Sequence, residues 1–218
     1  MKQNIYQIAI DGPGGAGKST IAKAVAKKLN FLFINTGGMY RCYAIALQGV
    51  DLTNLSLVKQ IMEQNKVNLD GDGLLLNDKD VTEQCANPNI AMLASTIGTI
   101  GLVREKCVKD QQAIAAGQNC IMEGRDTTTV VLPHATLKIY LTASIDVRAK
   151  RRWLQNNKTQ DIEWIKEDLK KRDYQDMNRK IAPLMKAPDA VEINTDNYSF
   201  EQNVQRVIEA FNKKIKEQ

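Results

Sequence analysis

The fold is decided by the stretch Gly12-Pro13-Gly14-Gly15-Ala16-Gly17-Lys18-Ser19, which matches the pattern G-x-x-x-x-G-K-[ST] in full. A short, isoleucine-rich run from Ile5 to Ile10 precedes it. From Ser19 to Leu29 the apolar residues recur with helical spacing. The sequence therefore predicts a buried strand, a tight loop and a helix in this order, and this is the context that the pattern requires.

Each residue type in this loop has a chemical task. Glycines let backbone N–H groups turn toward phosphate oxygens, and the helix N-terminus adds partial positive charge. Lys18 supplies a mobile charge to the β- and γ-phosphates, and Ser19 offers its hydroxyl to Mg²⁺. We therefore expect an ATP site with Mg²⁺ as cofactor, in which Lys18 is catalytic. The expected ATP-binding residues are Gly12, Pro13, Gly14, Gly15, Ala16, Gly17, Lys18, Ser19 and Thr20.

The composition is that of an ordinary globular protein, with 218 residues, 43% hydrophobic and 25% charged. The net charge of +5 suits phosphorylated ligands, nucleic acid or an acidic membrane, and does not choose among them. Because the longest early apolar stretch is only Ile8 to Ile10, we expect no signal peptide, no membrane span and a cytoplasmic location.

Cysteine and histidine usage argues against two classes of site. The single histidine, His134, disfavours a Ser-His-Asp triad or a multi-histidine metal site, and we expect it at the surface. The cysteines lack the spacing of zinc sites or disulfide frameworks, so buried, reduced thiols are predicted at Cys42, Cys85, Cys107 and Cys120.

The order of strands and helices predicts an α/β fold, because a strand–helix–strand unit favours a parallel sheet. Gly71-Asp72-Gly73 separates two short apolar runs and predicts a hairpin inserted in this fold. Further strands are expected at Phe31–Ile34, Cys120–Glu123, Leu137–Leu141 and Ala190–Asn194. Helices are expected at Gly38–Leu47, Leu57–Gln64, Ile90–Ala116 with a break near Gly98 and Gly101, Ile145–Leu154, Ile162–Arg179 and Phe200–Lys216.

Arginines on loops and helix faces indicate a second phosphorylated substrate, because planar guanidinium groups bind phosphate bidentately. Arg148, Arg151 and Arg152 share one helix face, as do Arg172, Asp176 and Arg179. The alternative for the second set is a solvated surface with an ion pair between Arg172 and Asp176. A GTPase is disfavoured, because the nearest approach to N-K-x-D, at residues 77–80, has its lysine one position too late.

Several motifs, in order along nearly the whole chain, resemble those of bacterial-type cytidylate kinases. Besides the phosphate loop from Asp11 to Thr20, they are Asn35-Thr36-Gly37-Gly38-Met39-Tyr40-Arg41, Leu76-Asn77-Asp78-Lys79-Asp80-Val81-Thr82, Glu123-Gly124-Arg125-Asp126, and Arg172 to Arg179 followed by Ala182-Pro183-Leu184. The resemblance implies a P-loop kinase: a central parallel sheet flanked by helices, an acceptor-binding insertion with a small β element, and a short lid.

The resemblance also implies boundaries within a single unit of residues 1–218. The core would comprise about 1–36, 105–143 and 181–218, the acceptor-binding region about 37–104, and the lid about 144–180. The implied activity is ATP- and Mg²⁺-dependent phosphorylation of CMP and dCMP by a monomer that binds no nucleic acid or membrane. A nucleotide phosphate is largely deprotonated at neutral pH, so no general base is expected.

Residue roles follow from the same resemblance. Arg41, Arg125 and Arg179 would hold the acceptor phosphate. Ser95, Arg104 and Asp126 would read the cytosine edge, and Arg172 and Asp176 would approach the ribose. Arg148 and Arg152, with Arg151, resemble lid arginines that close over the donor phosphates. The acceptor-binding set is Thr36, Arg41, Ser95, Arg104, Arg125, Asp126, Arg172, Asp176 and Arg179, and the catalytic set is Lys18, Arg125, Arg179, Arg148 and Arg152.

Glu123, at the end of a predicted strand, is a candidate for orienting a magnesium-bound water, and the alternative is a simple loop acid. Two positions depart from the family pattern. Thr127-Thr128-Thr129 stands where an apolar residue, Gly and Thr are usual, so a glycine able to take positive φ is replaced by a β-branched residue. Gly38 stands where Ala is common, and we expect it to loosen the start of its helix.

Two other functions stay open on the sequence alone. One is a different small-molecule kinase, with its nucleotide preference altered by Thr127 and Thr128. The other is a nucleic-acid-binding protein that uses the basic run Arg148-Ala149-Lys150-Arg151-Arg152, although this run lacks interleaved aromatic residues.

Overall fold

The computed structural model describes residues 4–217, and the chain forms two compact units. The first comprises Met1–Leu32 and Gln118–Gln218, and the second comprises Phe33–Gly117. The resemblance implied a core of about 1–36, 105–143 and 181–218, whereas residues 33–36 and 105–117 belong to the second unit. The lid at residues 144–180 remains a prediction. Among the described residues, no helix combines the length and the apolar character that a membrane span needs.

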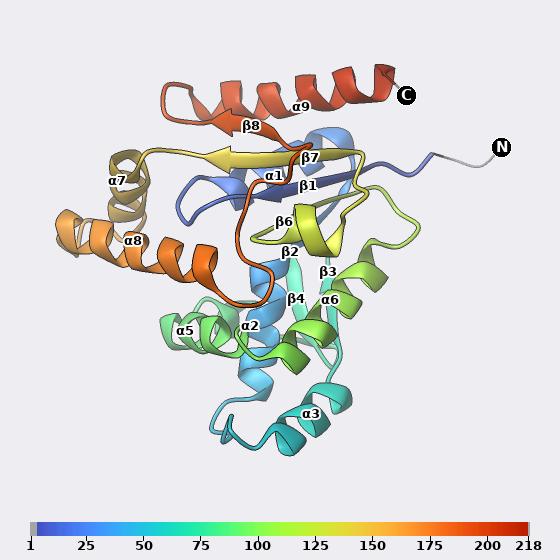
Figure 1. Ribbon diagram of the computed structural model, residues 1–218, viewed down its shortest axis with the longest axis vertical. Coiled ribbons are helices and arrows are strands. Elements are labelled where there is room, and N and C mark those ends of the chain that lie inside the picture. Colours follow the sequence, from blue (N-terminus) through green and yellow to red (C-terminus); the bar gives the residue numbers. More distant parts are fainter. Residues whose placement is uncertain (1–3, 218) are drawn as a thin grey trace. The chain divides into compact units, whose positions relative to one another are not determined.

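A five-stranded sheet with the order β2-β6-β1-β7-β8 forms the centre of the fold (Figure 1). β1 pairs in parallel with β6 on one side and β7 on the other, and β7 pairs in parallel with β8. Parallel strands buried on both faces favour continuous apolar runs, and Ile8, Ala9 and Ile10 of β1 have no exposed surface. The strands are β1 (Gln7–Asp11), β2 (Leu32–Asn35), β6 (Cys120–Gly124), β7 (Leu137–Thr142) and β8 (Val191–Asn194).

Helices of the first unit flank this sheet as predicted. α1 (Lys18–Leu29) packs on β6, α9 (Phe200–Lys216) packs on β7, and the two helices contact each other. The ring of Phe211 on α9 makes edge-to-face contacts with Tyr6 and Phe31, which close this side of the core. The α9 helix begins with a capping box, in which Ser199 and Gln202 satisfy each other's backbone N–H groups.

Two further helices lie beyond the carboxyl end of β7 (Figure 1). α7 (Ile145–Gln155) begins at the cap Ser144, and α8 (Ile162–Asn178) begins at the cap Asp161. They pack against each other through the buried residues Ala149, Ile165 and Leu169. The N-terminus of α7 therefore follows directly from the edge of the sheet at which ligands bind in open α/β folds.

The second unit contains five helices and the small β element among its described residues. Its three-stranded antiparallel sheet has the order β3-β4-β5, and the predicted hairpin turn at Gly71-Asp72 is confirmed. The predicted helix of residues 90–116 is interrupted as expected, and the short β5 and α4 were not predicted. The elements are α2 (Thr36–Ala46), α3 (Leu55–Gln64), β3 (Val67–Asp70), β4 (Gly73–Leu76), β5 (Lys79–Asp80), α4 (Thr82–Cys85), α5 (Pro88–Ile97) and α6 (Gly101–Ala115).

Gly38 has a packing role that the sequence did not reveal. A Cβ added at this position would lie 2.9 Å from Leu74 Cδ1, because β4 packs directly on the first turn of α2. The side chain of Asn35 accepts a hydrogen bond from the Gly38 N–H at 2.9 Å and caps the helix. The start of α2 is therefore held by a cap and by Leu74, and the expected loosening is compensated.

Candidate active site

The phosphate loop connects β1 to α1 as the motif requires. A Cβ at Gly12 would lie 1.9 Å from the Leu141 carbonyl oxygen, so only glycine lets the chain leave β1 beside β7. Gly15 and Gly17 have φ angles of 77° and 92°, which L side chains rarely adopt. Gly17 stands directly before α1, whose N-terminus carries partial positive charge. The loop thus has the backbone conformation and the helix terminus of an anion site.

Lys18 is buried in this loop and lacks a carboxylate partner in direct contact among the described residues. Its Nζ donates to the Pro13 carbonyl oxygen at 3.0 Å. Burial, and then the positive charge of Arg125, lower its pKa to about 7. Burial therefore destabilises the charged form of Lys18, and a nearby anion would stabilise it. The position of Lys18 in the loop thus favours a phosphate group beside its amino group.

Ser19 and Glu123 form the pair of oxygen donors that a magnesium site would need. The Ser19 hydroxyl donates to Glu123 Oε1 at 2.7 Å, and Glu123 is buried at the end of β6. Within residues 4–217 no group of three or more His, Cys, Asp or Glu side chains is placed to bind a metal. Mg²⁺ usually takes one or two protein oxygens and obtains its remaining ligands from phosphates and water, so the Ser19 hydroxyl and the Glu123 carboxylate have the chemistry that it requires.

Arg148 of α7 and Asp173 of α8 fix both helices to the phosphate loop. Arg148 Nη1 donates to Asp173 Oδ2 at 2.6 Å and to the Gly14 carbonyl oxygen at 3.0 Å. Asp173 Oδ1 accepts from the Gly14 N–H at 3.3 Å. The structure therefore places Arg148 beside the phosphate loop, while its role as a lid arginine stays a prediction, and Asp173 is a partner that the sequence did not indicate.

Arg151 also reaches the phosphate loop, through a residue that the sequence did not indicate. Its guanidinium donates to the Thr195 hydroxyl and to the Thr195 carbonyl oxygen, both at 2.9 Å, and to the Ala16 carbonyl oxygen at 3.3 Å. Thr195, at the end of β8, is fully buried and donates to the same Ala16 oxygen at 3.3 Å. Arg152, the other predicted lid arginine, has an exposed side chain.

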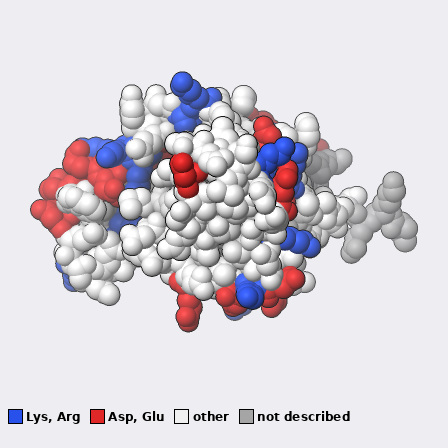
Figure 2. All heavy atoms as spheres, turned by 90° about the horizontal axis from the view of Figure 1, so that it is seen from below, with Lys and Arg blue, Asp and Glu red and all other residues white. Residues whose placement is uncertain are grey.

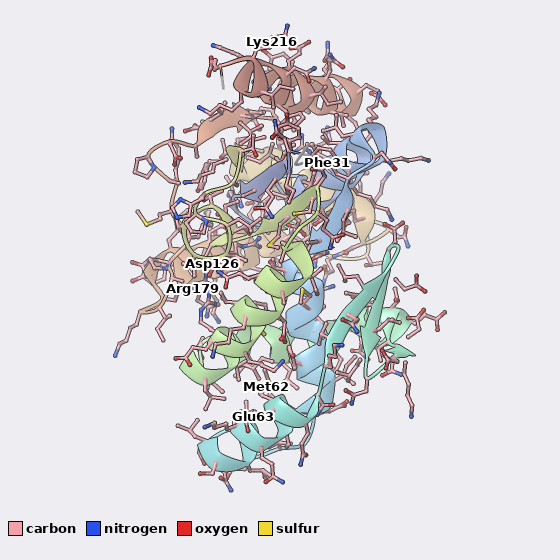
Figure 3. All side chains as sticks on the ribbon, turned by 90° about the vertical axis from the view of Figure 1, so that its right-hand side faces the viewer. Phe31, Met62, Glu63, Asp126, Arg179 and Lys216 are labelled. Atoms are coloured by element: carbon pink, nitrogen blue, oxygen red, sulfur yellow. The ribbon has the colours of Figure 1, made fainter. Side chains whose placement is uncertain are left out.

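Two ion pairs connect the segment after β6 with α8. Arg125 Nε donates to Asp176 Oδ2 at 2.7 Å, and Arg179 Nη2 lies 3.5 Å from Asp126 Oδ1. Figure 3 labels Asp126 and Arg179, which lie next to each other. A Cβ at Gly14 would lie 3.7 Å from Arg125 Nη2, so this guanidinium also borders the phosphate loop. Four predicted acceptor-binding residues are thus brought together.

Arg172 does not join this group. Its Nε lies 3.0 Å from Asp168 Oδ2, and its side chain is 57% exposed. The ion pair of Arg172 with Asp176, which was the alternative for this helix face, is therefore not formed, because Asp176 pairs with Arg125 and Arg172 pairs with Asp168. An acid four residues before its base is also the stronger orientation on a helix.

The basic run of α7 does not form an exposed patch. Arg148 is buried and Arg151 is half-buried, and both are bound to the phosphate loop. Only Lys150 and Arg152 of this run are exposed among its charged residues. Figure 2 shows acidic side chains mixed with basic ones at the left edge, the side on which α7 and α8 lie in Figure 1.

The remaining predicted acceptor-binding residues belong to the second unit. Thr36 begins α2 and is buried, and Arg41 Nη1 donates to the Cys85 carbonyl oxygen at 3.4 Å. Arg104 of α6 is buried, and its Nη1 donates to the Gly98 carbonyl oxygen at 3.2 Å. Gly98 ends α5, which carries the exposed Ser95 one turn earlier. Ser95 and Arg104 therefore lie near the same end of α5.

Comparison with known proteins agrees with the motifs. Residues 8–213 match the family model described as cytidylate kinase. A cytidylate kinase of Ureaplasma urealyticum is 44% identical over 221 residues and covers 99% of both chains. A cytidylate kinase of Geobacillus kaustophilus is 42% identical over 224 residues and covers 99% of this chain and 100% of that protein. The chain belongs to the cytidylate kinase family.

Solved structures agree on the fold of this cytidylate kinase family member. Shikimate kinase from Bacteroides thetaiotaomicron superimposes with a TM-score of 0.51 at 19% sequence identity, covering 94% of this chain and 98% of that one. The similarity shows a shared P-loop kinase fold. Family membership in turn confirms the resemblance inferred from the motifs, and makes the chain a kinase.

The departure from the cytidylate kinase pattern after Asp126 also has a structural explanation. Thr127–Val131 form a single π-helical turn (η1), and neither Thr127 nor Thr128 has a positive φ. The loop therefore does not need the glycine that the family usually has at position 128. Instead, the backbone N–H groups of Thr127 and Thr128 bind the carboxylate of Asp11 at 2.9 and 2.7 Å.

The predicted thiols and the single histidine lie where they were expected. All four cysteines are free and buried, and His134 is exposed. Cys42 and Cys85 stand closest, with their Sγ atoms 3.8 Å apart. These residues add no nucleophile or metal ligand to the site.

Proposed function

We propose that this chain transfers the γ-phosphoryl group of ATP to CMP and dCMP, giving ADP and the cytidine diphosphates. The observation that carries the proposal is the set of arginine and aspartate contacts around an intact phosphate loop, in a chain that belongs to the cytidylate kinase family. One phosphate site alone would serve many P-loop enzymes. The second set of guanidinium groups supplies the place for a second phosphate.

The donor nucleotide is proposed to bind on the phosphate loop, with its phosphates facing the loop backbone and Lys18. Arg148 and Arg151 already contact the loop, so their guanidinium groups need to move little to reach donor phosphates. Ser19, with Glu123 as its hydrogen-bond partner, would hold Mg²⁺. Mg²⁺ held there would supply positive charge that offsets the charge of the donor phosphates.

The acceptor is proposed to bind through the residues that the family pattern implies. Arg41, Arg125 and Arg179 would hold its phosphate. Asp126 would accept a hydrogen bond from the cytosine amino group, while Ser95 and Arg104 would bind the ring acceptors. Thr36 completes the proposed set, and Arg172 and Asp176 would approach the ribose.

Catalysis in this account needs positioning and charge neutralisation. The second pKa of a nucleotide phosphate is about 6, so the attacking oxygen is already largely deprotonated at neutral pH. Arg125 and Lys18 would offset the repulsion between the two phosphates. Closure of α7 and α8 over the donor would exclude water and suppress hydrolysis of ATP.

A coupled assay of ADP release tests the proposal with CMP, dCMP, UMP, AMP and GMP as acceptors at saturating ATP and Mg²⁺. We expect kcat/KM for CMP and dCMP to exceed that for AMP and GMP by about 100-fold or more, because unpaired buried polar groups reject the wrong base. Turnover that is no faster with CMP than with the other nucleotides would overturn it. The same panel tests the alternative of a small-molecule kinase with another nucleotide preference.

A further inference from the structure

The carboxylate of Asp11 is buried without a cationic partner in hydrogen-bond contact among the described residues. It ends β1, directly before the phosphate loop, and has no exposed surface. A buried charge of this kind is tolerated only where hydrogen bonds compensate for the lost water. Among the described residues, its hydrogen-bond donors come from two consecutive positions, Thr127 and Thr128.

The donors use both carboxylate oxygens. The Thr127 N–H binds Oδ1 at 2.9 Å, and the Thr128 N–H binds Oδ2 at 2.7 Å. The Thr128 hydroxyl adds a third bond to Oδ2 at 2.6 Å. Bonds to an ionised acceptor are about twice as strong as neutral ones. The third bond depends on the Thr128 side chain, because a glycine at this position would supply only the N–H.

Asp11 is also the β-ladder partner of Gly124, the last residue of β6. Asp11 thus contacts the chain at Gly124 and again at Thr127. The two residues between these contacts are Arg125 and Asp126. A segment this short, held at both ends by one residue, has little conformational freedom left. Its conformation therefore depends on the carboxylate that closes it.

We propose that Asp11 and Thr128 are positioning residues for the acceptor nucleotide, because together they close the loop that presents Arg125 and Asp126. This inference rests on the proposed function, in which Arg125 and Asp126 bind the cytidylate. Asp11 and Thr128 act through these two residues and do not contact the substrate. The hydroxyl of Thr128 supplies the rigidity at the position where the family usually has glycine.

The chain offers a matched control one residue away. Thr127 is buried like Thr128, but no partner for its hydroxyl is found among the described residues. Thr127→Val therefore removes a hydroxyl that binds nothing, while Thr128→Val removes the bond to Asp11. Both variants keep their backbone N–H groups. Thr128→Ser keeps the hydroxyl and is the rescue variant, and Thr128→Gly removes it without adding bulk.

The binding test compares Kd for CMP and for ATP by calorimetry on the folded full-length variants. We expect Thr128→Val and Thr128→Gly to raise Kd for CMP about tenfold, as for the loss of one hydrogen bond to a charged group. Kd for ATP should change less than about twofold, because β1 holds the phosphate loop by pairing with both β6 and β7. Thr128→Ser and Thr127→Val should bind CMP like the wild type.

A second readout needs no nucleotide. Amide hydrogen exchange of residues 124–128 should become about tenfold faster in Thr128→Val than in Thr127→Val, because closing hydrogen bonds slow local opening. Unchanged exchange, or equal loss of CMP and ATP affinity, would overturn the positioning role. If the wild type binds no CMP, the proposed function is wrong. If exchange is nevertheless faster in Thr128→Val than in Thr127→Val, the hydrogen bond between Thr128 and Asp11 still closes the loop.

Discussion

Asp173 binds Arg148 through one carboxylate oxygen, at 2.6 Å, and the backbone N–H of Gly14 through the other, at 3.3 Å. One side chain of α8 thereby joins α7 to the phosphate loop. The Gly14 N–H is one of the loop groups that we propose for phosphate binding, so Asp173 stands where a bound anion would be favoured. In the proposed function, this carboxylate would have to release the Gly14 N–H before a donor phosphate could bind it.

Replacing Asp173 tests the value of this contact. In Asp173→Asn we expect the free energy of unfolding to fall by about 2–4 kcal/mol, because Arg148 becomes an uncompensated buried charge. Urea denaturation measures this change. Asp146→Asn is the matched control, since it also breaks an ion pair between α7 and α8, to Lys166, but at an exposed position. Its cost should stay below about 1 kcal/mol. Equal effects of the two variants would contradict the buried role of Asp173.

Lys18 predicts a proton uptake on ATP binding. Burial lowers its pKa to about 7, so at pH 8 it is mostly neutral in the free protein, and bound phosphates restore its charge. Calorimetry at pH 8 in buffers of different ionisation enthalpy should show uptake of a large part of one proton. Lys18→Met should abolish this uptake. A buffer-independent enthalpy in the wild type would contradict the lowered pKa.

The same pKa shift predicts how the stability of the free protein depends on pH. Because the pKa of Lys18 is lower in the folded state than its ordinary value of 10.5, the unfolded chain binds more protons between pH 7 and 10.5. The contribution of Lys18 to the free energy of unfolding should therefore rise with pH across this window. Subtracting the pH profile of Lys18→Met isolates it, and a flat or falling difference would be the opposite result.

The local structure around the phosphate loop could be predicted from the sequence, because its parts are neighbours in the chain. The phosphate loop, its strand and its helix lie within residues 7–29, and the motif fixes all three. The N-cap at Asn54 is a local signal that was overlooked, so α3 begins at Leu55 rather than Leu57.

What was missed depends on residues far apart in the chain. The π-helical turn at Thr127–Val131 forms against Asp11, which lies 116 positions away. Asp176 forms its ion pair with Arg125 rather than with Arg172, because the tertiary fold brings α8 to the end of β6. The burial of Asp11 could have been suspected, because an acid directly after a buried apolar run is unusual. Its hydrogen-bond partners could not be predicted, because they are distant in the sequence.

The proposed role of Glu123 and Ser19 in holding Mg²⁺ predicts how the reaction rate depends on the Mg²⁺ concentration. In Glu123→Gln the carboxylate is lost while the side-chain shape is kept, so the Mg²⁺ concentration for half-maximal rate should rise about tenfold. Titrating Mg²⁺ at saturating nucleotides measures it. Glu167→Gln is the control, because Glu167 is exposed on α8 and forms a surface ion pair with Lys170. An unchanged requirement in Glu123→Gln would favour a simple loop acid.

Arg104 predicts selectivity for the acceptor. It is buried at the end of α5, and its guanidinium is oriented by the Gly98 carbonyl oxygen. Arg104→Lys keeps the charge but loses the planar fork, so KM for CMP should rise about tenfold or more while KM for ATP stays unchanged. Initial rates with each substrate varied in turn measure this, with the exposed Lys109→Ala as control. A parallel rise in both KM values would argue against a role in binding the base.

The most direct test follows the phosphoryl group itself. The wild-type protein is incubated with Mg²⁺, CMP and ATP labelled with ³²P at the γ-position, and the nucleotides and inorganic phosphate are separated. We expect the label to appear in CDP in an amount equal to the ADP formed, and we expect the Lys18→Met variant to lose this transfer. Label released as inorganic phosphate, with none in CDP, would contradict it.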